Sequence, residues 1–186
     1  DVYVIDAGGR QPRRLTPYPS DESATSWSRD GKWIYFRSDR TGRNEVWKMP
    51  FEGGEARQVT DNGGYAALES WDGKTLYYTK VAVYGVNTTP LFARPLAGGP
   101  ERQILDGVAN RAFFPVENGI YYVGAGEKPG TGALKFYDFA SARSRMLIRI
   151  EGSVGGGLAV SPDRKTILFV AGENGNADLM LIENFR

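Results

Sequence analysis

Four aspartates, Asp30, Asp39, Asp72 and Asp163, are the residues of this 186-residue chain whose type and spacing first suggest chemistry. Carboxylates that gather in one loop bind Ca²⁺ through several oxygen ligands at once. The clustered oxygen ligands of such a loop are missing around these four residues. Aspartate in such places normally fixes a tight turn through its side-chain oxygen. We therefore predict a structural role for the aspartates, with no metal and no cofactor.

The segment Gly124–Gly130 reads Gly-Ala-Gly-Glu-Lys-Pro-Gly and resembles a phosphate-binding loop. It lacks the Gly-Lys-Ser/Thr ending and the following helix of such loops, so a hairpin loop is the preferred interpretation. The chain contains no histidine and no cysteine. This removes the usual base of Ser-His-Asp catalysis, the commonest metal ligand and every thiol nucleophile. We therefore predict that this segment is not an enzyme.

Charge and hydrophobicity exclude two further kinds of partner. The 23 basic and 22 acidic residues nearly cancel, so no broad basic face for nucleic acid is expected. The longest apolar runs, such as Thr166–Ala171, are far too short to span a bilayer. Hydrophobic residues make up 41% of the chain, which is enough to build a core. We expect a folded domain without nucleic-acid contact and without a membrane span.

The elements that must position any site repeat along the chain with a period near 45 residues. One register of tight turns consists of Asp30-Gly31, Asp72-Gly73, Asn118-Gly119 and Asp163-Arg164, with steps of 42, 46 and 45 residues. A second register consists of Gly8-Gly9, Gly53-Gly54 and Gly98-Gly99, each 45 residues apart, with Ser141-Ala142 as a decayed fourth copy. Two sets of turns that alternate along the chain with the same period indicate a repeat architecture.

Each repeat contains four expected strands. In the clearest repeat, strand A is Ala24–Ser28, strand B is Trp33–Ser38, strand C is Glu45–Pro50 and strand D is Ala56–Thr60. Asp-Gly between strands A and B predicts a type I′ hairpin, in which both central residues have positive φ. The aromatic B strands do not alternate apolar with polar residues, which is typical of strands covered on both faces. We predict an all-β β-propeller of four-stranded antiparallel blades, with a β-sandwich as the alternative.

A family resemblance rests on Ser26–Arg40, which reads Ser-Trp-Ser-Arg-Asp-Gly-Lys-Trp-Ile-Tyr-Phe-Arg-Ser-Asp-Arg, and on the strand Glu45–Met49 that follows. This segment resembles the WD-type repeat of TolB-like propellers. Ser161–Lys165 is similar to its opening, with Arg164 in place of glycine, whereas Glu117–Gly119 departs from it. The resemblance implies a propeller that usually has six blades. Such domains occur in periplasmic assembly proteins, in serine peptidases and behind the winged-helix DNA-binding domains of bacterial regulators, which implies a periplasmic or extracytoplasmic location.

The repeat organises residues 1–186 as a single partial propeller of about four blades. The expected boundaries are a half blade with strands C and D at 1–20, blades at 21–62, 63–107 and 108–152, and a final blade at 153–186 that lacks strand D. We expect this to be the C-terminal part of a longer propeller, with roughly two blades upstream. Open blade edges favour self-association.

A binding site is expected on the face where the connections vary in length. The B–C and D–A loops lie at one end of the blades and differ among repeats, whereas the A–B and C–D turns at the other end are short and uniform. Variable loops on a rigid scaffold are where binding usually occurs. The candidate ligand- or partner-binding residues are Tyr65, Glu69, Tyr84, Asn87, Asn110, Arg111 and Phe113. The tryptophans Trp27, Trp33, Trp47 and Trp71 are expected to pack between blades.

Three functions compete for this propeller. The first is a non-catalytic binding or sensing module, with a protein partner or a small ligand at the variable-loop face and the mouth of the central channel. The second is the propeller domain of a serine peptidase, which requires a hydrolase domain with a Gly-x-Ser-x-Gly motif elsewhere. The third is a propeller lyase or glycosidase whose catalytic residues lie outside this segment. We favour the binding module because no set of catalytic side chains is evident.

Overall fold

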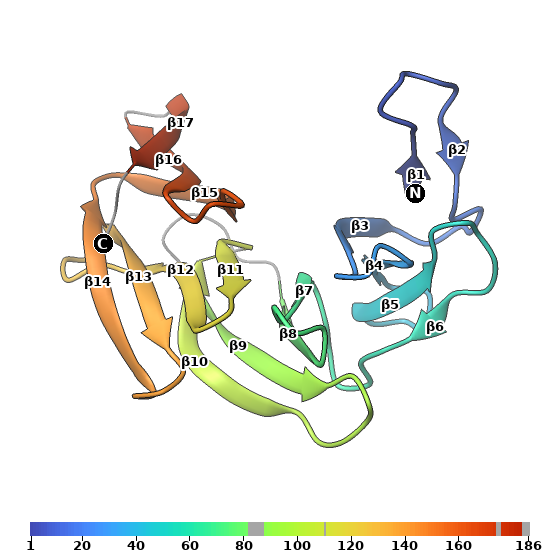
Figure 1. Ribbon diagram of the computed structural model, residues 1–186, viewed down its shortest axis with the longest axis horizontal. Coiled ribbons are helices and arrows are strands. Elements are labelled where there is room, and N and C mark those ends of the chain that lie inside the picture. The colour runs from blue at the N-terminus through green and yellow to red at the C-terminus, as the bar shows by residue number, and fades with distance from the viewer. Residues whose placement is uncertain (82–87, 110, 174–175, 184–186) are drawn as a thin grey trace. The chain divides into compact units, whose positions relative to one another are not determined.

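The computed structural model describes residues 1–81, 88–109, 111–173 and 176–183, and all regular structure within these ranges is β-strand (Figure 1). The first sheet pairs β1 (Tyr3–Val4) with β2 (Arg13–Arg14), and the second contains β3 (Glu22–Trp27), β4 (Trp33–Ser38), β5 (Glu45–Pro50) and β6 (Arg57–Gln58). The third contains β7 (Ala67–Glu69), β8 (Thr75–Thr79), β9 (Thr88–Pro95) and β10 (Arg102–Ala109).

Two further sheets complete the described chain. The fourth contains β11 (Phe113–Val116), β12 (Gly119–Ala125), β13 (Gly132–Asp138) and β14 (Arg143–Ile150), and the fifth contains β15 (Ser153–Val160), β16 (Thr166–Glu173) and β17 (Asn176–Glu183). Within each sheet, neighbouring strands follow one another in the sequence. This order confirms the predicted all-β propeller of four-stranded antiparallel blades. The predicted strands B and C of the clearest repeat have the same bounds as β4 and β5.

The chain divides into two compact units, which we describe separately. Unit 1 comprises Asp1–Val81 and Ala93–Glu101, and unit 2 comprises the remaining residues. The core of unit 1 lies between sheets, because Val2 and Leu15 of the first sheet segment join Phe36 and Met49 of the second in one buried cluster. In unit 2, residues of β11–β14 cluster with Val154, Ile167 and other residues of the last sheet. Burial on both faces explains why the B strands lack alternation.

The turns between strands A and B differ from the predicted type I′ hairpins. In the turn between β3 and β4, Gly31 has a positive φ (+70°), whereas Asp30 does not. The Gly31 amide donates to the Ser28 carbonyl (3.1 Å), and the Ser28 amide donates to the Trp33 carbonyl (2.9 Å). The turn is therefore longer than two residues and places one residue, the glycine, in the left-handed region. The prediction of two positive φ values was wrong, since the Asp30 side chain stabilises the turn in another way.

Arg164 occupies the position of this glycine in the last sheet, with φ +59°. We expect Arg164→Gly to raise the free energy of unfolding by about 0.5–1 kcal/mol, because the strain of a left-handed side-chain-bearing residue is relieved and only partly offset by the freer unfolded chain. The ion pair with Glu117 (3.5 Å) is exposed and contributes little. Urea unfolding measures the change. Gly31→Ala is the reverse control and should lower stability by a similar amount. A less stable R164G protein would contradict the argument.

Candidate functional site

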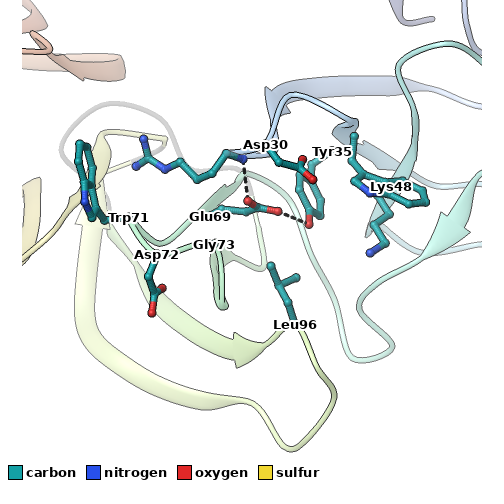
Figure 2. Close-up of a pocket in the computed structure, with 10 residues that line it drawn as sticks. Asp30, Tyr35, Lys48, Glu69, Trp71, Asp72, Gly73 and Leu96 are labelled. Carbon is teal, nitrogen blue, oxygen red and sulfur yellow. Dashed lines mark hydrogen bonds between the residues drawn. The ribbon is translucent and has the colours of Figure 1, made fainter.

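A cavity of about 480 Å³ lies in unit 1 where the A–B turns of the second and third sheets meet. We call it the turn cavity; its lining residues are Arg29, Asp30, Trp33, Tyr35, Lys48, Glu69, Trp71, Asp72, Gly73 and Leu96. Figure 2 shows Glu69 in the middle of this set, with Lys48 on one side and Trp71 on the other. The cavity therefore combines charged and aromatic side chains from consecutive repeats.

The two turns that border the cavity have the same internal hydrogen bonds. The hydroxyls of Ser28 and Ser70 donate to Asp30 Oδ1 and Asp72 Oδ1, both at 2.7 Å. The Lys32 and Lys74 amides donate to the same two oxygens, at 3.0 and 3.2 Å. These hydrogen bonds lower the pKa of both aspartates, so the carboxylates stay ionised. The arrangement agrees with the predicted structural role of the aspartates.

Asp163 repeats the arrangement in unit 2, where it accepts hydrogen bonds from the Ser161 hydroxyl (2.6 Å) and the Lys165 amide (3.1 Å). Asp39 differs, because its Oδ1 accepts the Asp21 amide (3.0 Å). The described residues contain no group of three or more acidic side chains placed to hold a metal ion. The side-chain oxygens of these aspartates thus accept hydrogen bonds from the protein itself, within the turn for Asp163 and from a separate segment for Asp39.

Glu69 and Tyr35 form the floor of the turn cavity. Glu69 is the last residue of β7 and is 7% exposed. Its carboxylate accepts hydrogen bonds from the Tyr35 hydroxyl (2.7 Å) and the Arg29 amide (2.7 Å), as the dashed lines in Figure 2 show. Burial, together with the adjacent carboxylate, raises the pKa of Tyr35. The hydroxyl therefore stays protonated and donates to the carboxylate, which holds the two side chains in place.

The walls of the cavity are aromatic rings that each lie against a cation. The Arg29 guanidinium lies 5.3 Å from the centre of the Trp71 ring and donates from Nε to the Ser70 carbonyl (3.2 Å). The Lys48 ammonium lies 4.7 Å from the centre of the Trp33 ring. Cations over tryptophan faces are attracted by the ring quadrupole. The walls are thus held in place before any ligand arrives.

Of the predicted site residues, Tyr84, Asn87 and Asn110 lie outside the described residues. In unit 1, Tyr65 is half-buried and its amide donates to the Thr79 carbonyl (2.7 Å). Glu69 is not at the variable-loop end: it is at the end of β7 that leads into the A–B turn. Glu69 lines the turn cavity, whereas Tyr65 does not.

In unit 2, Arg111 is exposed at a turn, whereas Phe113 is 1% exposed and pairs with Tyr122 across β11 and β12. The expectation for the tryptophans also needs correction. Trp47 is buried, but Trp27 and Trp71 are 52% and 50% exposed. Trp71 belongs to the A–B turn and not to a strand. Sequence reasoning missed it, although its place directly before Asp72-Gly73 was a usable signal.

Antiparallel sheets of this order, repeated along the chain with a tight turn between their first two strands, define a β-propeller domain. The chain belongs to the TolB beta propeller domain family, whose sequence model matches residues 1–154. The Tol-Pal system protein TolB of Helicobacter hepaticus is 30% identical over 102 residues, which are 53% of this chain and 24% of that protein.

Solved structures show the same fold. TolB from Acinetobacter baumannii superposes with a TM-score of 0.80 at 19% identity, over 98% of this chain and 46% of that chain. An oligogalacturonate lyase from Vibrio parahaemolyticus has a TM-score of 0.59 at 16% identity, over 92% of this chain and 52% of that chain. The chain thus spans between about a quarter and about half of these proteins. The lyase shows that this fold also occurs in an enzyme.

Within the described residues, no helix is long and apolar enough to cross a membrane.

Proposed function

We propose that this chain is a non-catalytic binding module, and that a protein partner contacts unit 1 at the turn cavity. The observation that carries the proposal is Trp71, which is 50% exposed at the edge of a cavity of about 480 Å³. Tryptophan and arginine dominate the residues that contribute most to protein interfaces. Trp71 and Arg29 stack on each other, so less side-chain freedom is lost on binding.

Two further points support this proposal. The hydroxyl of Tyr35 and both oxygens of Glu69 have partners within the protein, which favours a rigid binding surface over general acid–base chemistry. The relative in Helicobacter hepaticus is named as a Tol-Pal system protein, which favours a role among other proteins. By the same relationship we propose an extracytoplasmic location. The variable-loop end of unit 1, with Tyr65, is proposed as a second surface for a partner or small ligand, and Arg111 is proposed separately as a contact residue of unit 2.

Trp71→Ala tests the proposal. Extracts of the source cells are passed over the immobilised chain, the captured protein is identified, and its dissociation constant is measured by calorimetry. We expect W71A to weaken binding about 30-fold, because loss of a tryptophan that carries much of the binding energy costs about 2 kcal/mol. Circular dichroism and thermal unfolding verify that the variant is folded.

Trp27→Ala is the matched control, since Trp27 is equally exposed but does not line the turn cavity. Its dissociation constant should stay within about threefold of wild type, a change below 1 kcal/mol. Equal losses in the two variants would remove the turn cavity as the binding surface. If no protein binds the chain with a measurable constant, the proposal of a protein-binding module fails.

A further inference from the structure

Two cations lie directly opposite each other on β5 and β6. Lys48 and Arg57 are register partners in this antiparallel pair. Both approach the ring of Trp33, with the Lys48 ammonium 4.7 Å and the Arg57 guanidinium 5.7 Å from its centre. Arg57 is exposed and Lys48 is half-buried. The three side chains therefore form one cluster, which we call the cation pair on Trp33.

Like charges directly opposite each other on neighbouring strands destabilise a sheet. The lysines of the two A–B turns avoid this problem, since Lys32 lies 3.9 Å from Asp30 and Lys74 lies 3.9 Å from Asp72. Lys48 and Arg57 make no ion pair within the described ranges of the chain. The Trp33 ring compensates their charge only in part. The cluster thus holds two positive charges that an added anion would neutralise.

The position of Lys48 connects this cluster with space for a ligand. Lys48 and Leu96 line the turn cavity and also a second cavity of about 170 Å³, which continues along Gln58, Val59 and Arg94. Figure 2 shows Lys48 on the side of the turn cavity opposite Trp71. A segment that contacts both Trp71 and Lys48 therefore crosses the turn cavity.

We propose that the cation pair on Trp33 is an anion site that receives a carboxylate side chain from an acidic segment of the protein partner. This inference rests on the proposed function and specifies the partner's chemistry. Arginine can bind a carboxylate through two parallel N–H donors, and lysine adds a compact charge beside it. The carboxylates of Asp30 and Asp72, each beside one lysine, oppose an acidic ligand elsewhere in the cavity, so the cation pair sets where the acidic group binds.

The test uses a tetraglutamate peptide with acetylated and amidated ends, tetraglutamine as the neutral peptide, and sodium phosphate as a free anion. Binding to the 186-residue chain is followed at low ionic strength by calorimetry. We expect tetraglutamate to bind and tetraglutamine not to bind. The double variant Lys48→Gln, Arg57→Gln should lose about tenfold in affinity for tetraglutamate. Its midpoint of thermal unfolding should not fall, since a like-charge contact is removed.

Lys32→Gln, Lys74→Gln is the matched control, because it also removes two positive charges, here from lysines that pair with Asp30 and Asp72 of the turn cavity. This control should change the affinity for tetraglutamate by no more than about twofold. Equal losses in the two double variants, or no binding of tetraglutamate by wild type, would overturn the anion site. Phosphate binding as tight as tetraglutamate binding would overturn its assignment to a carboxylate side chain.

Binding of the captured partner to the variants distinguishes a failure of this inference from a failure of the proposed function. If W71A weakens binding of the captured partner and K48Q/R57Q does not, the acidic-segment inference fails while the proposal of a binding module stands. If tetraglutamate binds through Lys48 and Arg57 but no protein partner binds the chain, the anion site stands and the proposed function fails.

Discussion

Replacing Arg40 by alanine is expected to lower the free energy of unfolding by about 3–5 kcal/mol. The Arg40 guanidinium lies 3.4 Å from Oε1 of Glu22, whose side chain is fully buried, while Arg40 itself is 16% exposed. Removing one partner of a buried ion pair leaves the other charge in a medium that solvates it poorly. Within the described structure, Oε2 of Glu22 accepts no hydrogen bond. At Oε1 the carboxylate also accepts hydrogen bonds from the Ser20 and Ser38 hydroxyls. The amino group of Asp1 lies 3.8 Å from Oε2, so Arg40 is the side-chain cation that pairs with this carboxylate.

Arg40 also holds three aromatic rings together. Its guanidinium carbon lies 4.2 Å from the ring centre of Tyr18, 4.6 Å from that of Trp47 and 5.5 Å from that of Phe36. A planar guanidinium stacks on such rings, whereas the ammonium of lysine does not. Arg40→Lys keeps the charge but loses the stacking, so we expect a smaller loss of about 1–2 kcal/mol.

Urea unfolding followed by tryptophan fluorescence measures these losses. The double variant R40A/E22Q should recover part of the loss, because a neutral amide replaces the unpaired buried carboxylate. Arg10→Ala, at an exposed position, is the matched control and should change stability by less than about 0.5 kcal/mol. A loss below about 1 kcal/mol in R40A would show that Glu22 does not depend on Arg40.

This example shows what the sequence could and could not predict. Ser38-Asp39-Arg40 belongs to the segment that carries the family resemblance, so its place after strand B was predictable. The rings around Arg40 come from Tyr18, Phe36 and Trp47, which lie in three separate segments. Local patterns do not specify which side chains meet across such distances in the sequence. The strands were predictable because apolar runs and turn residues act locally.

The candidate site was likewise predictable from the sequence only in part. Glu69 was chosen from the sequence, but its partners Arg29 and Tyr35 lie about one repeat earlier in the chain. This pairing depends on how consecutive sheets pack, which the repeat period alone does not specify. Strand direction places the end of β7 at the A–B turn, so the cavity forms at the end of the sheets that was expected to be uniform. Arg29 and Trp71 occupy equivalent positions, directly before Asp30 and Asp72, so the two turns differ in the side chain at this position.

Glu45→Gln is expected to lower the free energy of unfolding by about 2–4 kcal/mol, although the two side chains have the same shape. Glu45 is 0% exposed at the start of β5. Its carboxylate accepts hydrogen bonds from the Thr60 hydroxyl (2.6 Å), from the Gly63 amide (3.0 and 3.1 Å) and from Arg43 Nε (2.7 Å). All of these groups donate, so an amide nitrogen in place of one oxygen would face donors.

Thr60 cannot fully adapt to the change. Its Oγ1 already accepts the Val46 amide (2.8 Å), and its hydroxyl hydrogen therefore points to Glu45. An amide nitrogen at that position would leave this hydrogen buried without an acceptor, which costs more than a typical hydrogen bond contributes. The other orientation of the glutamine would place its nitrogen against Arg43 instead. Both orientations are therefore less stable than the carboxylate.

Chemical denaturation and amide hydrogen exchange together test this expectation. Exchange at the Gly63 amide should accelerate in E45Q, since its acceptor is weakened, and this readout reports the local contact apart from global unfolding. Glu52→Gln, at an exposed position in the turn after β5, is the control. It should change the free energy of unfolding, and the free energy of local opening at the Gly63 amide, by no more than about 0.5 kcal/mol each. If E45Q keeps both the stability and the Gly63 exchange rate of wild type, then the negative charge of Glu45 is not required to join the start of β5 to the loop that precedes β7.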